Sequence, residues 1–512
     1  MLSTFADSTA AAKAMNDALA KTFTPPTVDW ASILPVILVV CTGIVGLIIE
    51  MLRPKRNNNA IVLTTLVGLF VAGVSVVAQF GAADLESFGT MVLRDRFGSA
   101  IQLILILVTG LTVMFSEGYL RAKRIAYGEF YPLLLWSASG AMIMATTKNL
   151  LMLFLGLEVL SIALYVLAGM SRGEQKSEES ALKYFLLGSF ASAFLLYGIA
   201  MLYGATGTLH LDGIAAGWNP GDESSRNLMV FGLVLLLFGL GFKAAFVPFH
   251  QWTPDVYQGA PTNVTAFMAA GSKIGAVAAL WRVLDASVTN QTLFASQLQD
   301  FWMPILFWVA ILTMTVGNLV ALVQKDVKRI LGYSSIAHAG YILVAILAHA
   351  RNPEAIGFGT VVYYLLAYSL MTVGALAVVS MTATGGKEGT RLEDLHGLWK
   401  RQPFAVVCLI VFMASLIGVP PTAGFMGKLM VFNDALNSGL MELAIVLAVN
   451  SVISVFYYVG IAKAAFVDDE DALRRESAPM NSGLAGTCAL CAAGVFLCVL
   501  LYNPLTVWLV GR

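Results

Sequence analysis

Apolar stretches long enough to cross a membrane recur along this chain from residue 30 onward, separated by short polar or Gly/Pro-rich breaks. About twenty consecutive apolar residues span a bilayer as one helix, so each stretch predicts a transmembrane helix. The predicted fold is therefore an all-α polytopic membrane protein. Its fourteen expected spans lie at residues 30–52, 60–80, 98–119, 130–147, 149–169, 180–204, 227–248, 261–282, 301–323, 329–349, 355–383, 403–437, 440–466 and 482–509.

Two of these spans contain proline in or beside their apolar sequence. The seventh runs into Pro248, and the twelfth contains Pro420, Pro421 and Gly424. Proline removes a backbone donor and clashes with the preceding helical turn, so both spans are expected to be broken helices. Broken helices at membrane depth occur where they line a cavity or pack inside protein, and a matched pair of them indicates inverted repeats around a transport site.

Spans 4–8 and 9–13 are accordingly predicted to form two inverted five-helix repeats. The seventh span then corresponds to the twelfth, so Lys243 corresponds to Lys428, and the fifth corresponds to the tenth, which sets Glu158 against residues 333–338. The expected divisions of the chain are a non-cytoplasmic N-terminal tail (1–29), spans 1–3 (30–129), the first repeat (130–285), the second repeat (286–467), and a loop with span 14 (468–512).

The distribution of basic residues supports this count and predicts an orientation. Loops on one side of the predicted membrane domain hold 18 basic residues, loops and ends on the other side hold 9, and 4 lysines lie inside spans, which accounts for all 31. Cytoplasmic loops carry the excess of Lys and Arg. Both termini are therefore expected on the periplasmic side.

Composition agrees with a membrane protein and excludes other classes. Only 12% of the residues are charged, against about 25% in a soluble domain. The net charge of zero gives no reason to expect a nucleic-acid partner. Cys488 and Cys491 form a CxxC without a second pair or a histidine, so they are expected to be packing residues. The sequence has no nucleotide-binding loop, metal-ligand cluster or nucleophile motif, and no cofactor is expected in this chain.

Five ionisable residues lie inside the apolar stretches: Glu158, Lys183, Lys243, Lys273 and Lys428. A charge at bilayer depth costs at least ~2.5–3.5 kcal/mol, so it seldom persists without a partner or a function. All five side chains can gain or lose a proton, which arginine cannot. The use of lysine rather than arginine therefore indicates proton transfer through the membrane domain.

Each of these ionisable residues could instead have a purely structural role. Glu158 could form a static ion pair with a lysine of a neighbouring helix, and Lys428 could bind the end of the broken helix. Lys183 lies three residues into its span and could extend back to the surface, so its part in transport is the weakest. His338 lies in mid-span among serines and a tyrosine, where a histidine suits a proton relay, although a lone histidine is often only a helix contact.

Several motifs resemble the antiporter-like membrane subunits of respiratory complex I. They are residues 157–161 (LEVLS), 242–257 (FKAAFVPFHQWTPDVY), 259–262 (GAPT), 324–329 (QKDVKR), 333–336 (YSSI) and 418–425 (GVPPTAGF). The resemblance covers the chain from residue 30 on. Within the family, Lys428 occupies a position where subunit M and its Mrp antiporter relative have glutamate, and no long lateral helix like that of subunit L follows the last spans. These features, with fourteen spans, favour the bacterial subunit N branch.

The resemblance implies a proton-translocating, non-redox subunit in the membrane arm of an NADH–quinone oxidoreductase of a bacterial inner membrane. Glu158 and Lys243 would form a modulating pair, Lys273 the central relay, and Lys428 the residue facing the exit or the next subunit. The supporting relay residues would be His338 and Lys183. NAD, flavin, iron–sulfur clusters and quinone would bind to other subunits. The implied partners are a neighbouring antiporter-like subunit, small membrane subunits and the lipid bilayer.

Two other functions remain open on the sequence. A Mrp-type cation/proton antiporter subunit would need a sodium site, and Lys428 in place of an acid argues against it. A structural spacer in a large complex would have no use for buried lysines, which are costly to keep.

Overall fold

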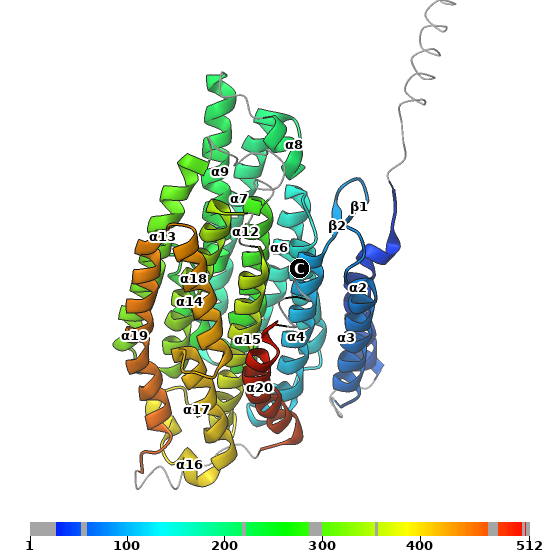
Figure 1. The fold of residues 1–512 in the computed structure, drawn as a ribbon. Helices are drawn as coiled ribbons and strands as arrows, with labels where there is room; N and C mark the ends of the chain where they lie inside the picture. The colour runs from blue at the N-terminus through cyan, green and yellow to red at the C-terminus, as the bar shows by residue number, and fades with distance from the viewer. Residues whose placement is uncertain are drawn as a thin grey trace, which may run out of the picture.

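The computed structural model describes residues 27–52, 59–217, 222–285, 299–353, 357–468, 480–503 and 507, and nearly all of them are helical (Figure 1). Most of the predicted N-terminal tail (1–26), the basic residues at 53–56 and 474–475, and the end of the last predicted span lie outside the described residues. The longer helices run side by side in Figure 1, with α2 and α3 at one edge and α13 and α19 at the other.

The first ten helices that the structure describes lie between residues 30 and 267. They are α2 (Trp30–Leu52), α3 (Asn59–Gln79), α4 (Arg96–Ala122), α5 (Phe130–Ala145), α6 (Leu150–Ala168), α7 (Gln175–Thr206), α8 (Leu211–Ala216), α9 (Glu223–Ala244), α10 (Trp252–Gly259) and α11 (Thr262–Phe267), as far as the described residues show. The others described are η1 (Met268–Ser272), α12 (Lys273–Asp285), α13 (Gln299–Leu322), α14 (Val327–Arg351), α15 (Gly359–Val379), η2 (Ser380–Thr382), η3 (Leu392–Leu395), α16 (Leu398–Arg401), α17 (Pro403–Ile417), α18 (Ala423–Asn437), α19 (Met441–Ala464) and α20 (Ser482–Leu500).

The helices confirm the predicted multi-span fold. Twelve helices in the described part of the chain are long and apolar enough to cross a membrane, and α5 and α17 are shorter apolar helices. Together they cover every stretch that the hydropathy pattern predicted. The most enclosed are the Thr262–Asp285 segment, α14 and α15, whose apolar windows are 100%, 94% and 94% buried. Residues on these three segments are therefore packed almost entirely against other parts of the protein.

Both predicted breaks are present. The helix α9 ends at Ala244 and the chain resumes as α10 only at Trp252, after Pro248. The helix α17 ends at Ile417, followed by Gly418 at φ +93°, a left-handed backbone conformation that glycine adopts without a Cβ clash. The helix α18 then begins at Ala423. Each break ends one helix inside the protein, so its last carbonyl groups need partners other than the next helical turn.

A third irregularity was not predicted. Within the eighth span, α11 passes into the π-helical segment η1, which ends immediately before Lys273. A π-helical turn holds an extra residue, and such turns are frequent at functional sites. No proline marks this position, and its glycine and serine residues fit an ordinary helix as well, so the hydropathy pattern gave no sign of it.

Two short antiparallel hairpins connect spans at opposite ends of the molecule. One pairs β1 (Leu85–Ser87) with β2 (Val92–Arg94), and the other pairs β3 (Ala383–Thr384) with β4 (Lys387–Glu388). The amide of Gly386 donates to the carbonyl oxygen of Ala122, so the β3–β4 hairpin packs on the end of α4. Loops that the charge pattern placed on one side of the membrane thus meet at one end of the bundle.

Candidate functional site

Lys243 lies at the end of α9, next to the first break. Its buried ammonium donates to the hydroxyl groups of Ser161 on α6 and Tyr184 on α7, both at 2.8 Å. It also lies 4.9 Å from the centre of the Tyr184 ring. Two hydroxyl oxygens and an aromatic face replace part of the hydration that a buried cation loses. The first break therefore presents Lys243 to a polar contact between three helices.

Glu158 lies one turn before Ser161 on α6, so its charge acts on Lys243 from the same helix face. Its Oε1 atom is buried and has no hydrogen-bond partner among the described residues. Lys243 donates to Ser161 and Tyr184, and it forms no ion pair with Glu158 in this structure. The modulating role of Glu158 that the family resemblance implies stays a prediction.

Lys273 begins α12, directly after the π-helical segment. Its buried ammonium donates to the carbonyl oxygen and, at 2.5 Å, to the hydroxyl of Ser335 on α14. It lies 5.1 Å from the ring centre of Tyr368 on α15. The hydroxyl of Tyr257 on α10 is 3.4 Å from the same Ser335 hydroxyl. Lys273 therefore lies at the centre of the bundle, where elements from both predicted repeats meet.

His338 lies one turn beyond Ser335 on α14, and both of its ring nitrogens have partners. Its Nδ1 is 2.9 Å from the hydroxyl of Tyr364 on α15, and its Nε2 is 3.1 Å from the hydroxyl of Tyr458 on α19. The Tyr458 hydroxyl is also hydrogen-bonded to Ser334. A neutral imidazole donates from one nitrogen and accepts at the other, and tyrosine hydroxyls can do either. The His338 ring can therefore accept a proton at one nitrogen and release a proton from the other.

Lys428 lies on α18, after the second break, and its buried ammonium binds the helix that the break ends. It donates to the carbonyl oxygens of Leu416, at 3.0 Å, and Ile417, at 2.8 Å, the last two residues of α17. These carbonyls have no partner in a following turn, and the negative end of the helix dipole attracts a cation. The ammonium also lies 5.3 Å from the ring centre of Tyr341 on α14.

One face of α14 connects these groups. Ser335, His338 and Tyr341 are spaced three residues apart, so they lie one above another on the same side of the helix. Lys273 contacts the first of them and Lys428 faces the third. The structure thus brings Lys273, His338 and Lys428 together along a single helix, which sequence spacing did not predict for residues so far apart.

Lys183 is placed differently. Its side chain is 40% exposed and forms ion pairs of 2.7 Å with Glu179, one turn earlier on α7, and with Asp255 on α10. Asp255 is also paired with Arg329 at the start of α14. These contacts tie three helices together near the surface. A part for Lys183 in proton relay stays a prediction.

An aromatic layer separates the Lys243 group from the Lys273 group. Trp252 of α10 stacks on Tyr184 with ring centres 4.7 Å apart, and the Tyr257 ring lies edge-to-face with Trp252 at 6.3 Å. In the part of the chain that the structure describes, no side-chain hydrogen bond crosses this layer. The four sequence-predicted residues therefore form two polar groups, with Glu158 and Lys243 in one and Lys273 and Lys428 in the other.

Sequence reasoning missed most of the partners of these charges. The tyrosines at 184, 364, 368 and 458 read as ordinary core residues, because a tyrosine in an apolar span usually contributes packing area. Asn318 was a usable signal, since a buried amide must find partners. Its Nδ2 atom donates to the Tyr341 hydroxyl at 3.1 Å and to Asn450 Oδ1 at 3.2 Å.

A second ionic group lies at the end of the bundle where the β3–β4 hairpin packs. The Glu388 side chain on β4 is only 4% exposed and accepts hydrogen bonds from the hydroxyls of Tyr119, at 2.7 Å, and Thr262. The ammonium groups of Lys123 and Lys328 lie 3.5 and 3.7 Å from its Oε2. The sequence gave no reason to single out Glu388, because it lies in a polar loop where an acid is normally exposed.

Burial by itself would raise the pKa of the Glu388 carboxyl, but the ammonium groups of Lys328 and Lys123 and the two hydroxyls outweigh it. The pKa is held below its usual range. Because the pKa is lower in the folded protein than in the unfolded chain, the ionised carboxylate stabilises the fold. This contribution is complete above the unfolded pKa and is lost as pH falls through the folded pKa.

We therefore expect Glu388→Gln to lower the stability of the detergent-solubilised complex at pH 7 by about 3–5 kcal/mol, the usual effect of breaking a buried ion pair. The deficit should shrink as pH falls below the unfolded pKa of about 4.3 and the wild-type carboxyl also becomes protonated. Thermal unfolding between pH 3.5 and pH 8 measures this directly. Glu442→Gln, at an exposed glutamate of α19, is the control. An equal deficit at both pH limits would contradict the electrostatic explanation.

Comparison with known proteins gives consistent results. Residues 147–454 match the family model described as "NADH:quinone oxidoreductase/Mrp antiporter, TM". A Trichlorobacter lovleyi protein named NADH-quinone oxidoreductase subunit N is 40% identical over 435 residues, covering 85% of this chain and 87% of that protein. A chain of respiratory complex I from Thermus thermophilus, solved with bound aureothin, matches with a TM-score of 0.76 and 35% identity, over 92% of this chain and 98% of that one. A chain of the Mrp complex from Dietzia sp. shares the fold, with a TM-score of 0.79 at 20% identity over 94% of this chain and 96% of that one.

Proposed function

We infer the function of this chain from its membership of the NADH:quinone oxidoreductase/Mrp antiporter family, to which it belongs as a subunit N of NADH–quinone oxidoreductase. It is a proton-translocating membrane subunit of complex I and a non-redox part of that translocase. The observation that carries this conclusion is the 40% identity to a named subunit N over 85% of the chain. Its partners are the other membrane-arm subunits, and it crosses the lipid bilayer many times.

Redox chemistry is assigned to other subunits. NAD, flavin, iron–sulfur clusters and quinone bind elsewhere in the complex, and this chain holds no cofactor of its own. The membrane is the bacterial inner membrane, with both termini on the periplasmic side. The excess of Lys and Arg in the loops at the Glu388 end of the bundle supports this orientation, because cytoplasmic loops carry that excess.

Protons move through a row of buried groups parallel to the membrane plane. Glu158 modulates Lys243 through its charge, Lys273 is the central relay, and Lys428 is the residue at the far end. His338, between two tyrosine hydroxyls, connects Lys273 to Lys428 along α14. The aromatic layer at Trp252 divides the row, so transfer from Lys243 to Lys273 is the step that needs water or a side-chain movement.

The internal repeat supports the same path. The repeats at 130–285 and 286–467 each contribute one broken helix, and each break lies beside a buried lysine, Lys243 or Lys428. In the second repeat the break also supplies the carbonyl groups that hold the lysine. Spans 1–3 (30–129), the N-terminal tail (1–29) and the final segment (468–512) lie outside the repeats.

A Mrp-type antiporter subunit is the weaker alternative. The likeness to the Mrp complex is one of fold, at 20% identity. Lys428, which binds carbonyl oxygens with its ammonium, occupies a place where a sodium ion would need a carboxylate.

Lys243→Ala and Lys428→Ala test the row at its two ends. In membrane vesicles carrying the assembled complex, each variant is expected to reduce quinone-linked NADH oxidation and the accompanying proton uptake about 10²-fold, the lower end of the range for loss of a proton-transferring group. Both rates are measured on the same vesicles and normalised to the content of assembled complex. Normal proton uptake in both variants would contradict the proposed path.

A further inference from the structure

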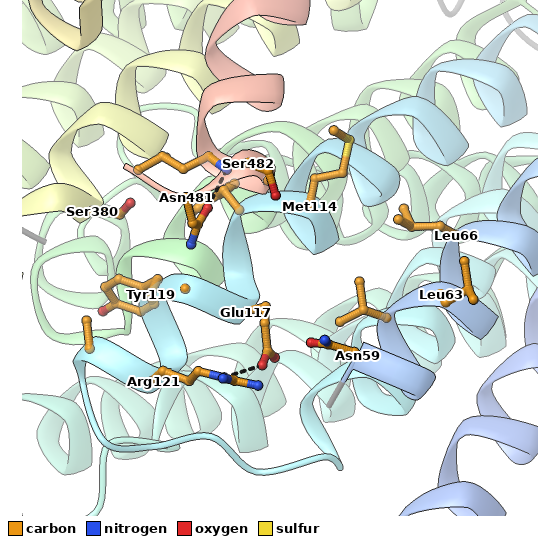
Figure 2. Close-up of a pocket in the computed structure, with 16 residues that line it drawn as sticks. Asn59, Leu63, Leu66, Met114, Glu117, Tyr119, Arg121, Ser380, Asn481 and Ser482 are labelled. Carbon is orange, nitrogen blue, oxygen red and sulfur yellow. Dashed lines mark hydrogen bonds and ion pairs between the residues drawn. The ribbon is translucent and has the colours of Figure 1, made fainter. Parts of the chain in front are cut away.

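A cleft of about 880 Å³ opens between α3 and α20, and α4 forms its floor (Figure 2). Its mouth lies where three helices end or begin: Arg121 is in the last turn of α4, Asn59 is the first residue of α3, and Asn481 caps the start of α20. The cleft therefore opens at the edge of the membrane domain, at the end where the basic loops meet. It is remote from Glu158, Lys243, Lys273 and Lys428, none of which lines it.

The cleft changes from polar to apolar with depth. Glu117 and Arg121 lie at its mouth, and Figure 2 shows Leu63, Leu66 and Met114 along its inner part. Leu63 and Leu66 are about one and two helical turns inside Asn59, and Met114 is about two turns inside Arg121. Polar groups at the membrane boundary with apolar groups below them match a molecule that has a polar head and an apolar tail.

The mouth carries a pair of opposite charges. The Nε atom of Arg121 donates to Glu117 Oε1 at 2.5 Å, and Glu117 Oε2 accepts from the Tyr131 hydroxyl at 2.9 Å. The Arg121 side chain is 55% exposed. Guanidinium groups bind phosphate strongly, and a neighbouring carboxylate attracts an ammonium group. This pair of charges matches a zwitterionic headgroup.

Close packing of α20 against α4 keeps the cleft open on that side. At Gly483, near the start of α20, an added Cβ would lie 2.0 Å from the carbonyl oxygen of Met114, so α20 already touches the backbone of α4. On the other side, α3 presents Leu63 with 64% of its surface exposed. Because α20 already contacts the backbone of α4, it cannot move closer to fill the cleft.

We propose that this cleft binds one phospholipid with a zwitterionic, amine-bearing headgroup. Its phosphate lies against Arg121 and its amine near Glu117, and an acyl chain follows Leu63, Leu66 and Met114. The bound lipid attaches the peripheral helix α3 to the α4–α20 contact. This inference goes beyond the proton-transfer function and does not depend on it.

Lipid retention by the purified complex tests the proposal. The complex is reconstituted with phosphatidylethanolamine and then washed in detergent, and the lipid kept by this subunit is counted by native mass spectrometry. The wild-type subunit should keep one phosphatidylethanolamine, whereas Arg121→Gln should weaken its retention at least about tenfold, as expected for loss of a charge-assisted hydrogen bond. Leu63→Trp, which fills the apolar part, should weaken it as well. Soluble glycerophosphoethanolamine should not displace the lipid, because it lacks the acyl chains.

Two controls match these variants. Lys400→Gln removes another basic residue that is about half exposed, at 52%, and ion-paired at 2.7 Å, with Asp468. Val67→Trp places the same tryptophan side chain at another exposed position of α3, outside the cleft lining. Both should retain the lipid, and all four variants should keep normal proton uptake. Equal retention in Arg121→Gln and the wild type would overturn the proposal. So would a Leu63→Cys variant that cross-links to a neighbouring subunit instead of to a lipid probe.

Discussion

Replacing Lys273 by methionine is expected to abolish proton uptake by the assembled complex, with a fall of about 10²-fold or more, the effect of losing a general acid–base group. Methionine keeps the length and apolar stem of lysine but has no transferable proton. The ammonium is the group that binds the Ser335 carbonyl and hydroxyl on α14, one turn before His338. Without it, nothing among the described side chains at this junction carries a charge between α12 and α14.

The measurement is proton uptake and quinone-linked NADH oxidation in the same vesicles, normalised to assembled complex. Lys176→Met, at an exposed lysine in the first turn of α7, is the matched control and should leave both rates unchanged. Lys273→Arg adds a sharper comparison, because arginine keeps the charge and does not release its proton. It should be as deficient in proton uptake as Lys273→Met. Normal proton uptake in Lys273→Met would contradict the relay role and would leave this lysine with a structural role alone.

Gly424→Ala is expected to destabilise the second broken helix by about 1–3 kcal/mol or more, the usual range for overpacking. A Cβ at this position would lie 1.8 Å from the carbonyl oxygen of Ser415 and 2.7 Å from its carbon. Backbone atoms cannot rotate away as a side chain can, so α17 and α18 must separate. The carbonyls of Leu416 and Ile417 would then move away from Lys428, which holds them now.

Thermal unfolding of the complex and proton uptake should both fall in Gly424→Ala. Gly460→Ala is the matched control, because no atom lies within 4 Å of a Cβ added there on α19. It should be neutral, or slightly stabilising through the better helix propensity of alanine. If Gly424→Ala unfolds at the wild-type temperature and pumps normally, the close contact across the break has no functional importance.

The parts of the fold that the sequence predicted depend on local properties. Hydropathy over about twenty residues predicted the spans, because a bilayer requires that length of apolar helix. Pro248 and Pro421 predicted the two breaks, because a proline acts on the helical turn that contains it. The π-helical segment before Lys273 and the β3–β4 hairpin had no such local marker, and both appeared only in the structure.

The candidate site also contains residues that the sequence predicted and residues that it did not. A charged residue in an apolar stretch is visible in one sequence, so Glu158, Lys243, Lys273 and Lys428 were identified without a structure. Their hydrogen-bond partners were not identified in this way: Ser161 and Tyr184, whose hydroxyl groups accept from Lys243, appeared only in the structure.

The sequence by itself therefore determined which residues are charged inside the membrane, how many helices surround them, and where two of those helices break. Only the tertiary structure decided that Lys273 and Lys428 contact the face of α14 that carries His338. It also decided that the aromatic layer at Trp252 separates these residues from Lys243. The physical reason is that burial and helix breaking follow from neighbours along the chain. The partners of a buried charge, in contrast, come from helices that pack against it but lie far away along the chain, such as α6 against α9.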